Sequence, residues 1–288
     1  MFETNGTMLH VQNGDSTVGF DLVRGNVTWN FNGVDIFNRG PELYFYRAMT
    51  QNDNGQSGNA EEWDDAWVHS MRTQVRDVFW EDMGDALQVR YTVRVAPQVL
   101  EWGAEADLIY TVPYDQASLS IHAQGDFVGN NTPEVLPRIG LLAHMPEQFD
   151  DVAWFGRGPG ENYPDSKTSQ RFGQWESDVA GLFTNYDYPQ ENGNRGDLRW
   201  LRIGHPDAGV TLDARMDGEP FAFTAKRVSD YDLNDAGHPY ELSRLNMTIL
   251  NLDYKNHGLG SATVGPRPFE PYKCYSGPFD FTFHLSLV

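Results

Sequence analysis

The chain has 288 residues, of which 40% are hydrophobic and 13% aromatic, a composition that excludes a disordered protein and is typical of a globular one. Its 41 acidic and 21 basic residues give a formal net charge of −20, which repels phosphate backbones and anionic lipids and argues against nucleic acid or a membrane as a partner. The N-terminus carries no basic and apolar leader, and no apolar stretch is long enough to cross a bilayer. We therefore expect a cytoplasmic protein.

Alternating hydrophobicity predicts a series of short strands along the chain. Near the N-terminus, residues 27–31 and 34–37 flank Asn32-Gly33, a pair typical of a type I′ hairpin turn. The clearest alternation is at residues 86–95, where every second side chain is apolar, as in a strand with one buried face. Further strands are expected at residues 106–112, 118–122, 210–214, 221–224, 247–252 and 279–287.

Helical periodicity is scarce. Residues 61–71 could form one helix with Trp63, Trp67 and Met71 on one side, and residues 231–236 could form a second short one. The chain has none of the repeated strand–helix alternation that a βα barrel requires. Short strands between clusters of Gly, Pro, Asn and Asp predict an all-β antiparallel sandwich, and the absence of a linker predicts one domain over residues 1–288.

The first of three unusual loops, residues 47–58, follows the aromatic segment 44–46. Its alternating Asn and Asp residues are similar to part of a calcium loop, but no Glu stands at the twelfth position. A mobile surface loop with Gly55 and Gly58 as hinges fits this composition better.

The second loop, residues 154–165, contains Arg157, Glu161, Asn162 and Tyr163. A guanidinium, an acid, an amide and an aromatic ring together can bind sugar hydroxyls and a sugar face. A phosphate cradle would need a following Gly-Lys-Ser/Thr, which is absent. The competing interpretation, a rigid corner with Arg157 and Glu161 tied to the backbone, is also consistent with the glycines of this loop.

The third loop, residues 188–195, contains an Asn192-Gly193 turn between Glu191 and Arg195. These two charged side chains are predicted to pair across the turn. A structural role is the first interpretation of this pair, and a sugar-binding or interface role is the second.

The sequence shows no catalytic constellation and no metal site. Many carboxylates are present, but spacing alone cannot bring two of them to the separations used in glycoside hydrolysis. The eight histidines lack metal-ligand spacing, and a Gly-x-Ser-x-Gly elbow is absent. The single cysteine, Cys274, excludes an internal disulfide, and its turn-like surroundings do not favour a nucleophile.

Six segments in one order resemble the C-terminal domain of the large β-galactosidases of glycoside hydrolase family 2. The three loops supply Arg47-Ala48 with Asn52-Asp53-x-Gly55, the Gly-rich corner and the Glu-Asn-Gly-Asn-Arg turn. The resemblance continues through residues 223–233, 236–238 and 252–261. It covers about residues 7–288, which makes it far more specific than any one of these motifs.

This resemblance implies a large supersandwich similar to galactose mutarotases. In some lactic acid bacteria the domain is a separate small chain, and this chain begins with Met1 just before the first matching segment. It therefore resembles a small subunit whose partner is a large subunit. That partner would carry both catalytic glutamates on a βα barrel, with magnesium and a monovalent cation near them, for retaining hydrolysis of β-galactosides such as lactose. This chain would bind no cofactor itself.

The resemblance also suggests substrate-site residues. Asn52, Asp53 and Gly55 match a loop that moves near the active site, and residues 260–266 match a loop that reaches the sugar. Some relatives have a stacking tryptophan where this chain has Val264, or Thr263 with a shift of one residue. An aliphatic side chain there would lose about 1 kcal/mol of ring stacking.

A second departure is Gln51, which stands where the family usually has Asp. If that acid tethers the loop in the relatives, the hinge of this chain differs from theirs.

Two other functions remain open at this stage. A sugar mutarotase or epimerase on the same fold would need a histidine acid and a glutamate base, for which His144 or His238 and Glu161 or Glu191 are candidates. A carbohydrate-binding module without catalysis is the third possibility.

Overall fold

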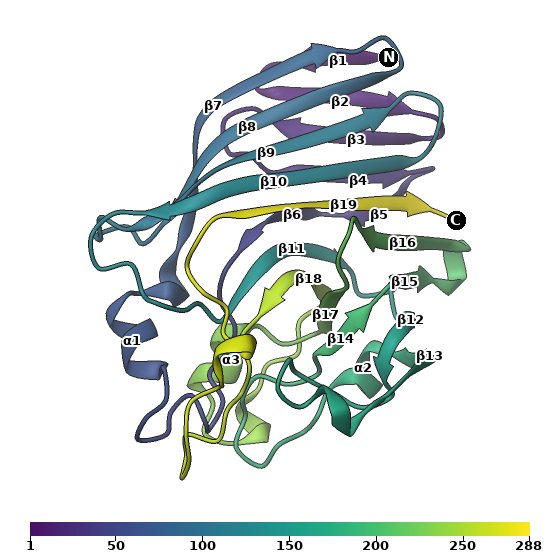
Figure 1. Ribbon diagram of the computed structural model, residues 1–288. Coiled ribbons are helices and arrows are strands. Elements are labelled where there is room, and N and C mark those ends of the chain that lie inside the picture. Colours follow the sequence, from purple (N-terminus) through teal and green to yellow (C-terminus); the bar gives the residue numbers. More distant parts are fainter.

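The computed structural model describes residues 1–288 and consists mainly of antiparallel strands in three sheets (Figure 1). The largest sheet has nine strands in the order β13-β12-β15-β16-β19-β10-β9-β8-β7. In chain order these strands are β7 (Arg72–Asp82), β8 (Ala86–Ala96), β9 (Gly103–Pro113), β10 (Ser118–Val128), β12 (Asp151–Gly158), β13 (Arg171–Asp178), β15 (Trp200–His205), β16 (Val210–Met216) and β19 (Phe279–Leu287).

Two five-stranded sheets complete the molecule. The N-terminal sheet is a meander of β1 (Phe2–Asn5), β2 (Met8–Asn13), β3 (Ser16–Asp21), β4 (Val27–Phe31) and β5 (Val34–Phe37). The other sheet has the order β14-β17-β18-β11-β6, with β6 (Arg39–Tyr44), β11 (Arg138–Pro146), β14 (Arg195–Leu198), β17 (Phe221–Lys226) and β18 (Met247–Asn256).

Both smaller sheets pack against the nine-stranded sheet. Phe20 of β3 lies 5.6 Å from Tyr110 of β9, ring centroid to ring centroid. Phe221 of β17 meets Phe283 of β19 edge-on at 5.3 Å. One cluster of 57 buried hydrophobic residues includes side chains of all three sheets. The expected all-β antiparallel sandwich is therefore confirmed.

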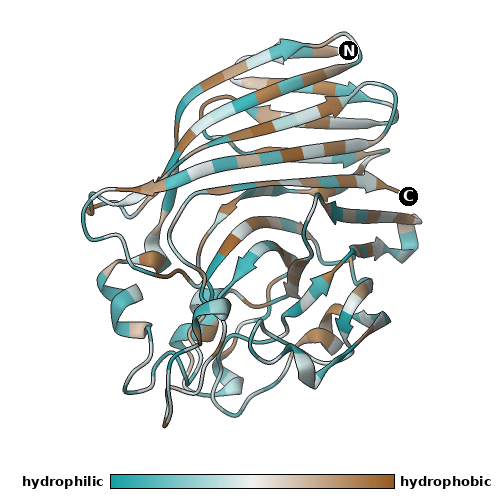
Figure 2. Ribbon diagram, viewed as in Figure 1, coloured by the Kyte–Doolittle hydropathy of each residue, from teal (hydrophilic) through white to brown (hydrophobic).

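The strand predictions are confirmed where the pattern alternates. In β8 the side chains of Leu87, Val89 and Tyr91 are buried while Arg90 between them is exposed, and Figure 2 shows the same alternation of apolar and polar residues along the long strands. The expected strands at the other six ranges also lie within observed ones. Asn32 and Gly33 both have positive φ, 48° and 85°, as a type I′ turn requires.

Helices are short. They are α1 (Ala60–Asp65), α2 (Val179–Leu182) and α3 (Asp230–Asp235), with 3-10 turns at Val68–Ser70, Lys167–Ser169, Pro206–Ala208, Pro239–Glu241 and Glu270–Tyr272. No helix has the length and apolar character needed to traverse a bilayer.

The helix expected at residues 61–71 is wrong in its extent. It ends after Asp65, because Trp67 adopts left-handed backbone angles with φ of 55°, which interrupt a right-handed helix. Trp102 donates its indole hydrogen to the carbonyl of Ala66 at 2.8 Å and so satisfies a group at the helix end. Trp63 is buried as expected, whereas Trp67 is 44% exposed.

The packing predicts which phenylalanines contribute most to the free energy of unfolding. Replacing Phe283, which is fully buried, in a Phe283→Ala variant should lower the free energy of unfolding by about 3–5 kcal/mol, because apolar contact is lost and a cavity remains. The matched Phe79→Ala variant, at a side chain 53% exposed, should change it by about 0.5 kcal/mol or less. Urea denaturation of both variants checks this, and equal losses would contradict the assignment of the core.

Candidate functional site

Two of the loops identified in the sequence are joined to each other although more than 200 residues separate them. Thr263 donates its hydroxyl hydrogen to the side-chain oxygen of Asn52 at 2.8 Å. Asn52 in turn donates from its amide nitrogen to the carbonyl of Gly260 at 2.9 Å. We call residues 51–58 together with residues 260–267 the loop clasp.

The far end of the loop clasp is closed by further bonds. Arg267 donates to the carbonyl of Ser57 at 2.6 Å and to that of Gly58 at 2.9 Å. Ser57 donates its hydroxyl hydrogen to the carbonyl of Gly265 at 3.2 Å. A Cβ atom at Gly55 would overlap the carbonyl of Ala262, so the backbones approach as closely as only glycine allows. The two loops therefore form one unit.

The loop clasp presents one apolar side chain to the outside. Val264 is 97% exposed, while its neighbour Thr263 is held by its bonds to Asn52 and to the carbonyl of Gln51 at 3.0 Å. Because so little of its surface is covered, Val264 is free to contact whatever lies beyond the loop clasp.

Asp53 has a structural role in its loop. Arg47 donates to both of its carboxylate oxygens, at 2.9 and 3.3 Å, and Thr50 donates to it from backbone and hydroxyl at 2.8 Å. Arg47 is fully buried, with its guanidinium 5.5 Å from the ring centroid of Trp63. With its oxygens bound in this way, Asp53 has no free carboxylate edge for the calcium ion considered above.

A buried ion cluster lies behind the loops. Arg138 of β11 donates to Glu191 of the third loop at 2.8 Å and lies 3.4 Å from Asp253 of β18. Lys226 of β17 lies 3.3 Å from Glu191 and pairs with Asp230 of α3. All five side chains are at most 2% exposed. Charges removed from water in this way are stable only when paired, so the cluster ties three strands to two loop segments.

The cluster holds three carboxylates and two cations. Asp253 has the longest contacts of the three. Its shortest is a 3.2 Å hydrogen bond from Asn256, whereas Arg138 approaches Glu191 to 2.8 Å. Burial raises the pKa of Asp253 to about 7, with Arg138 opposing and Glu191 adding to the shift. A proton on this carboxyl therefore balances the charges of the cluster.

The second and third loops are bound to the protein itself. Glu161 accepts from the backbone of Gly193 at 2.7 Å and from the hydroxyl of Tyr186. Arg157 donates to Asp197 at 3.0 Å. Asn162 and Tyr163 are buried. These contacts favour the rigid-corner interpretation of the second loop.

The predicted pair between Glu191 and Arg195 does not form. Glu191 bonds to Arg138 and Lys226, while Arg195 donates to the carbonyls of Pro159, Leu182 and Gly193 at 3.1, 3.0 and 2.8 Å. The turn directs the two side chains to different partners, and sequence proximity could not reveal those partners because they come from distant segments.

The histidine and glutamate pairs needed for a mutarotase are not assembled. His144 of β11 lines a cavity with Glu42, and neither Glu161 nor Glu191 is among its partners. His238 is exposed and lies 3.4 Å from Glu241.

The surroundings of Cys274 do not favour a nucleophile, and the side chains are not grouped as metal ligands. Cys274 is buried, and burial raises its thiol pKa to about 12, which disfavours a thiolate. No group of three or more His, Cys, Asp or Glu side chains is arranged to hold a metal ion.

Sequence reasoning missed Arg138, Lys226 and Asp230 as members of one cluster. A usable signal was present, because Lys226 stands two residues after the strand-like run Phe221 to Thr224 and Arg138 directly precedes an apolar run. Charged residues next to buried strands need partners, but the sequence does not say which ones.

The chain is similar to known proteins in both sequence and structure. The family model described as "Beta galactosidase small chain" matches residues 12–285. The β-galactosidase of Kluyveromyces lactis is 32% identical over 250 residues, and that of Arthrobacter sp. strain B7 is 30% identical over 243. These matches cover 86% and 79% of this chain but 24% of each relative, so the chain spans about a quarter of their length.

Solved structures agree with the fold. An aldose epimerase homologue from C. elegans superposes with a TM-score of 0.53 at 11% identity, covering 98% of both chains. A galactose mutarotase-like protein from Clostridium acetobutylicum gives a TM-score of 0.50 at 10% identity, covering 100% of this chain and 98% of the other. The fold is therefore galactose mutarotase-like, and at such identities the similarity concerns the fold alone.

The ion cluster predicts that two arginine-to-alanine variants lower the free energy of unfolding by unequal amounts. An Arg138→Ala variant leaves Glu191 with Lys226 alone, at 3.3 Å, and removes the cation beside Asp253. It should lower the free energy of unfolding by about 3–5 kcal/mol. In the control, Arg202→Ala, the lost partner is Asp213, and the arginine side chain is 46% exposed. That change should cost at most about 1 kcal/mol. Denaturant titration distinguishes them, and a mild effect at Arg138 would refute a buried, paired cluster.

Asp253 predicts a pH dependence of stability. Its pKa is raised in the folded protein, so the native state holds a proton that the unfolded chain releases, and stability is lost as pH rises from about 4 to about 7. An Asp253→Asn variant should lack this contribution. As pH rises over that range, the free energy of unfolding of the wild type should therefore fall relative to that of the variant. A difference that is independent of pH would show that Asp253 stays ionised.

Proposed function

Because this chain belongs to the β-galactosidase small-chain family, we propose that it is the small subunit of a heteromeric β-galactosidase and completes an active site on a large subunit. The large subunit supplies the remaining three quarters of the length found in the curated relatives, whose matches to this chain cover 24% of each. Such a subunit has no activity of its own and becomes part of a glycoside hydrolase on assembly.

The loop clasp is the observation that carries this proposal. Its two segments are the ones that the family resemblance assigns to the substrate side, and they are bonded to each other through Asn52, Thr263 and Arg267. A preformed wall of this kind can close one side of a sugar pocket and exclude water from it. In the assembled enzyme the loop clasp covers part of the pocket and presents Val264 toward the acceptor side of the substrate.

The chemistry is assigned to the large subunit. Retaining hydrolysis needs two carboxylic groups about 5 Å apart that reach the sugar, one as nucleophile and one as acid/base. In this chain the three carboxyl groups of the ion cluster are at most 2% exposed and have no access to a substrate. We assign the two catalytic glutamates to the large subunit, as the family resemblance implies. The same resemblance implies magnesium and a monovalent cation near them.

The substrates proposed are terminal β-D-galactosides such as lactose. Val264 has no ring to stack against an acceptor sugar, and stacking of this kind is worth about 1 kcal/mol. The acceptor side is therefore expected to be permissive toward different aglycones. The acidic chain, with its net charge of −20, is proposed to work in the cytoplasm.

The direct test is hydrolysis of a chromogenic β-galactoside by this chain, by the large chain and by the two mixed. The proposal expects activity only in the mixture, and a stable complex on gel filtration. Activity from this chain alone would refute it, since a catalytic pair would then have been overlooked. A chain that stays monomeric beside the large subunit would refute it as well.

The loop clasp gives a sharper prediction. A Gly55→Ala variant should force the backbones of residues 51–58 and 260–267 apart, because the added methyl group meets the carbonyl of Ala262. Misplacing a substrate-positioning wall by about 1 Å can cost up to about a hundredfold in rate, so kcat/KM of the mixed enzyme should fall by about tenfold or more.

The control is Gly277→Ala, where the new methyl group would meet nothing within 4 Å. It should leave kcat/KM unchanged. Gel filtration of both variants with the large chain confirms that the complex still forms. An unaltered kcat/KM in the assembled Gly55→Ala enzyme would show that the loop clasp is not part of the active site.

A further inference from the structure

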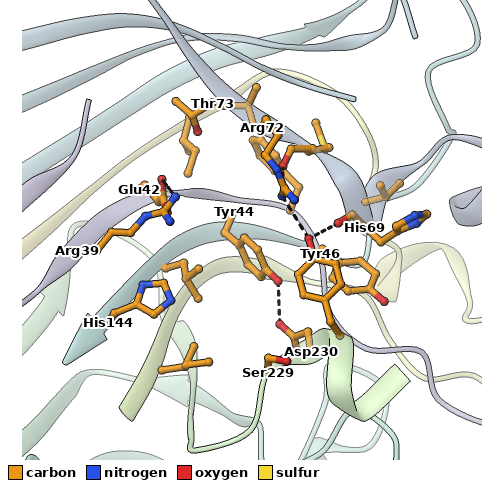
Figure 3. A pocket seen from close by; sticks show the side chains of 18 of the residues that line it. Arg39, Glu42, Tyr44, Tyr46, His69, Arg72, Thr73, His144, Ser229 and Asp230 are labelled. Carbon is orange, nitrogen blue, oxygen red and sulfur yellow. Dashed lines mark hydrogen bonds and ion pairs between the residues drawn. The ribbon is translucent and has the colours of Figure 1, made fainter. Parts of the chain in front are cut away.

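The cavity lined by His144 and Glu42 lies away from the loop clasp, where the sheet of β6, β11 and β18 faces the first residues of β7 (Figure 3). Its volume is about 270 Å³. Side chains of β6 and β11 form one side, the start of α3 forms the base, and the segment from Val68 to Thr73 forms the opposite side. No residue of the loop clasp lines it.

The base of the cavity is aromatic and held in place. Tyr44 projects into it and donates its hydroxyl hydrogen to Asp230 at 2.9 Å (Figure 3). Asp230 is fixed by Lys226 of the ion cluster. Tyr46 packs against Tyr231 with ring centroids 5.9 Å apart. Leu142, Leu245 and Ile249 add apolar surface. A fixed aromatic ring beside apolar side chains is suited to the face of a ring-shaped ligand.

His144 is the unexplained polar group of this cavity. Its Nδ1 atom is buried and has no hydrogen-bond partner, which is rare for buried polar atoms in folded proteins. Burial, helped by the nearby Arg39, lowers the pKa of the imidazole, so the ring is neutral and can accept at one nitrogen and donate at the other. Figure 3 shows the ring beside Tyr44, on the same side of the cavity as Glu42.

The charges around the cavity balance. Arg39 and Glu42 form an ion pair at 2.9 Å. Asp230 is already paired with Lys226, and Arg72 is exposed to solvent, which screens its charge. An anion would favour an excess of basic groups and a cation an excess of acidic ones. The lining therefore suits an uncharged ligand that both donates and accepts hydrogen bonds.

We propose that this cavity is an accessory binding site for one neutral sugar ring, packed against Tyr44 and hydrogen-bonded to His144 and Glu42. Its volume lies just below the range of about 300–1,000 Å³ typical of ligand pockets, which limits the ligand to a single ring. The site is separate from the loop clasp and does not depend on the large subunit.

The test is titration of the full chain with D-galactose, D-glucose and methyl β-D-galactoside, followed by calorimetry and by the imidazole NMR signals of the histidines. A saturable shift of the His144 signal is expected with at least one of these sugars. His144→Ala should weaken binding by about tenfold, the loss expected for a buried polar contact. Glu42→Gln should also weaken it, and circular dichroism verifies that both variants fold.

The matched control is His238→Ala, at an exposed histidine outside the cavity, which should bind the sugar as wild type does. Galacturonate and galactosamine test the charge argument. A His144 signal that responds to either charged sugar but to no neutral one would overturn the proposal, and so would sugar binding that is unchanged in both cavity variants. Because the measurement uses this chain alone, its failure is distinguishable from failure of the mixed enzyme to form.

Discussion

The structure depends on a cluster of five buried ionisable side chains around Arg138. Strands β11, β17 and β18 contribute Arg138, Lys226 and Asp253, while the third loop contributes Glu191 and α3 contributes Asp230. Removing Arg138 or Lys226 would leave more buried carboxylates than cations in a medium that solvates them poorly. The loops on this side of the sheet therefore cannot move independently of the strands, and long irregular segments gain a fixed position.

In this arrangement the buried carboxylates and the exposed loop clasp have different roles. The carboxylates at the centre of the loop-bearing face neutralise Arg138 and Lys226 and have no exposed surface for a substrate. What the chain offers to the outside is instead the loop clasp, which is hydrogen-bonded internally and apolar at Val264. This arrangement agrees with the proposed role as a supporting subunit, in which the catalytic groups come from the large subunit.

The sequence predicted those features that depend on near neighbours. Strand β8, the hairpin at Asn32-Gly33 and the short helix α3 follow from alternation, turn chemistry and local polarity. Strand β11 was missed because nearly all of its residues are buried, on both faces, so no alternation is visible. The partners of Glu191 and the contact between residues 51–58 and 260–267 were beyond reach, because segments far apart in the chain create them.

Hydrogen exchange measured by mass spectrometry, with and without the large subunit, tests the central claim most directly. If the loop clasp forms a wall of the shared active site, amides of residues 51–58 and 260–267 should exchange more slowly in the complex. They should slow further when a non-hydrolysable galactoside is added. Protection confined to other surfaces, such as the edge strand β7, with unchanged exchange in both segments, would contradict the claim.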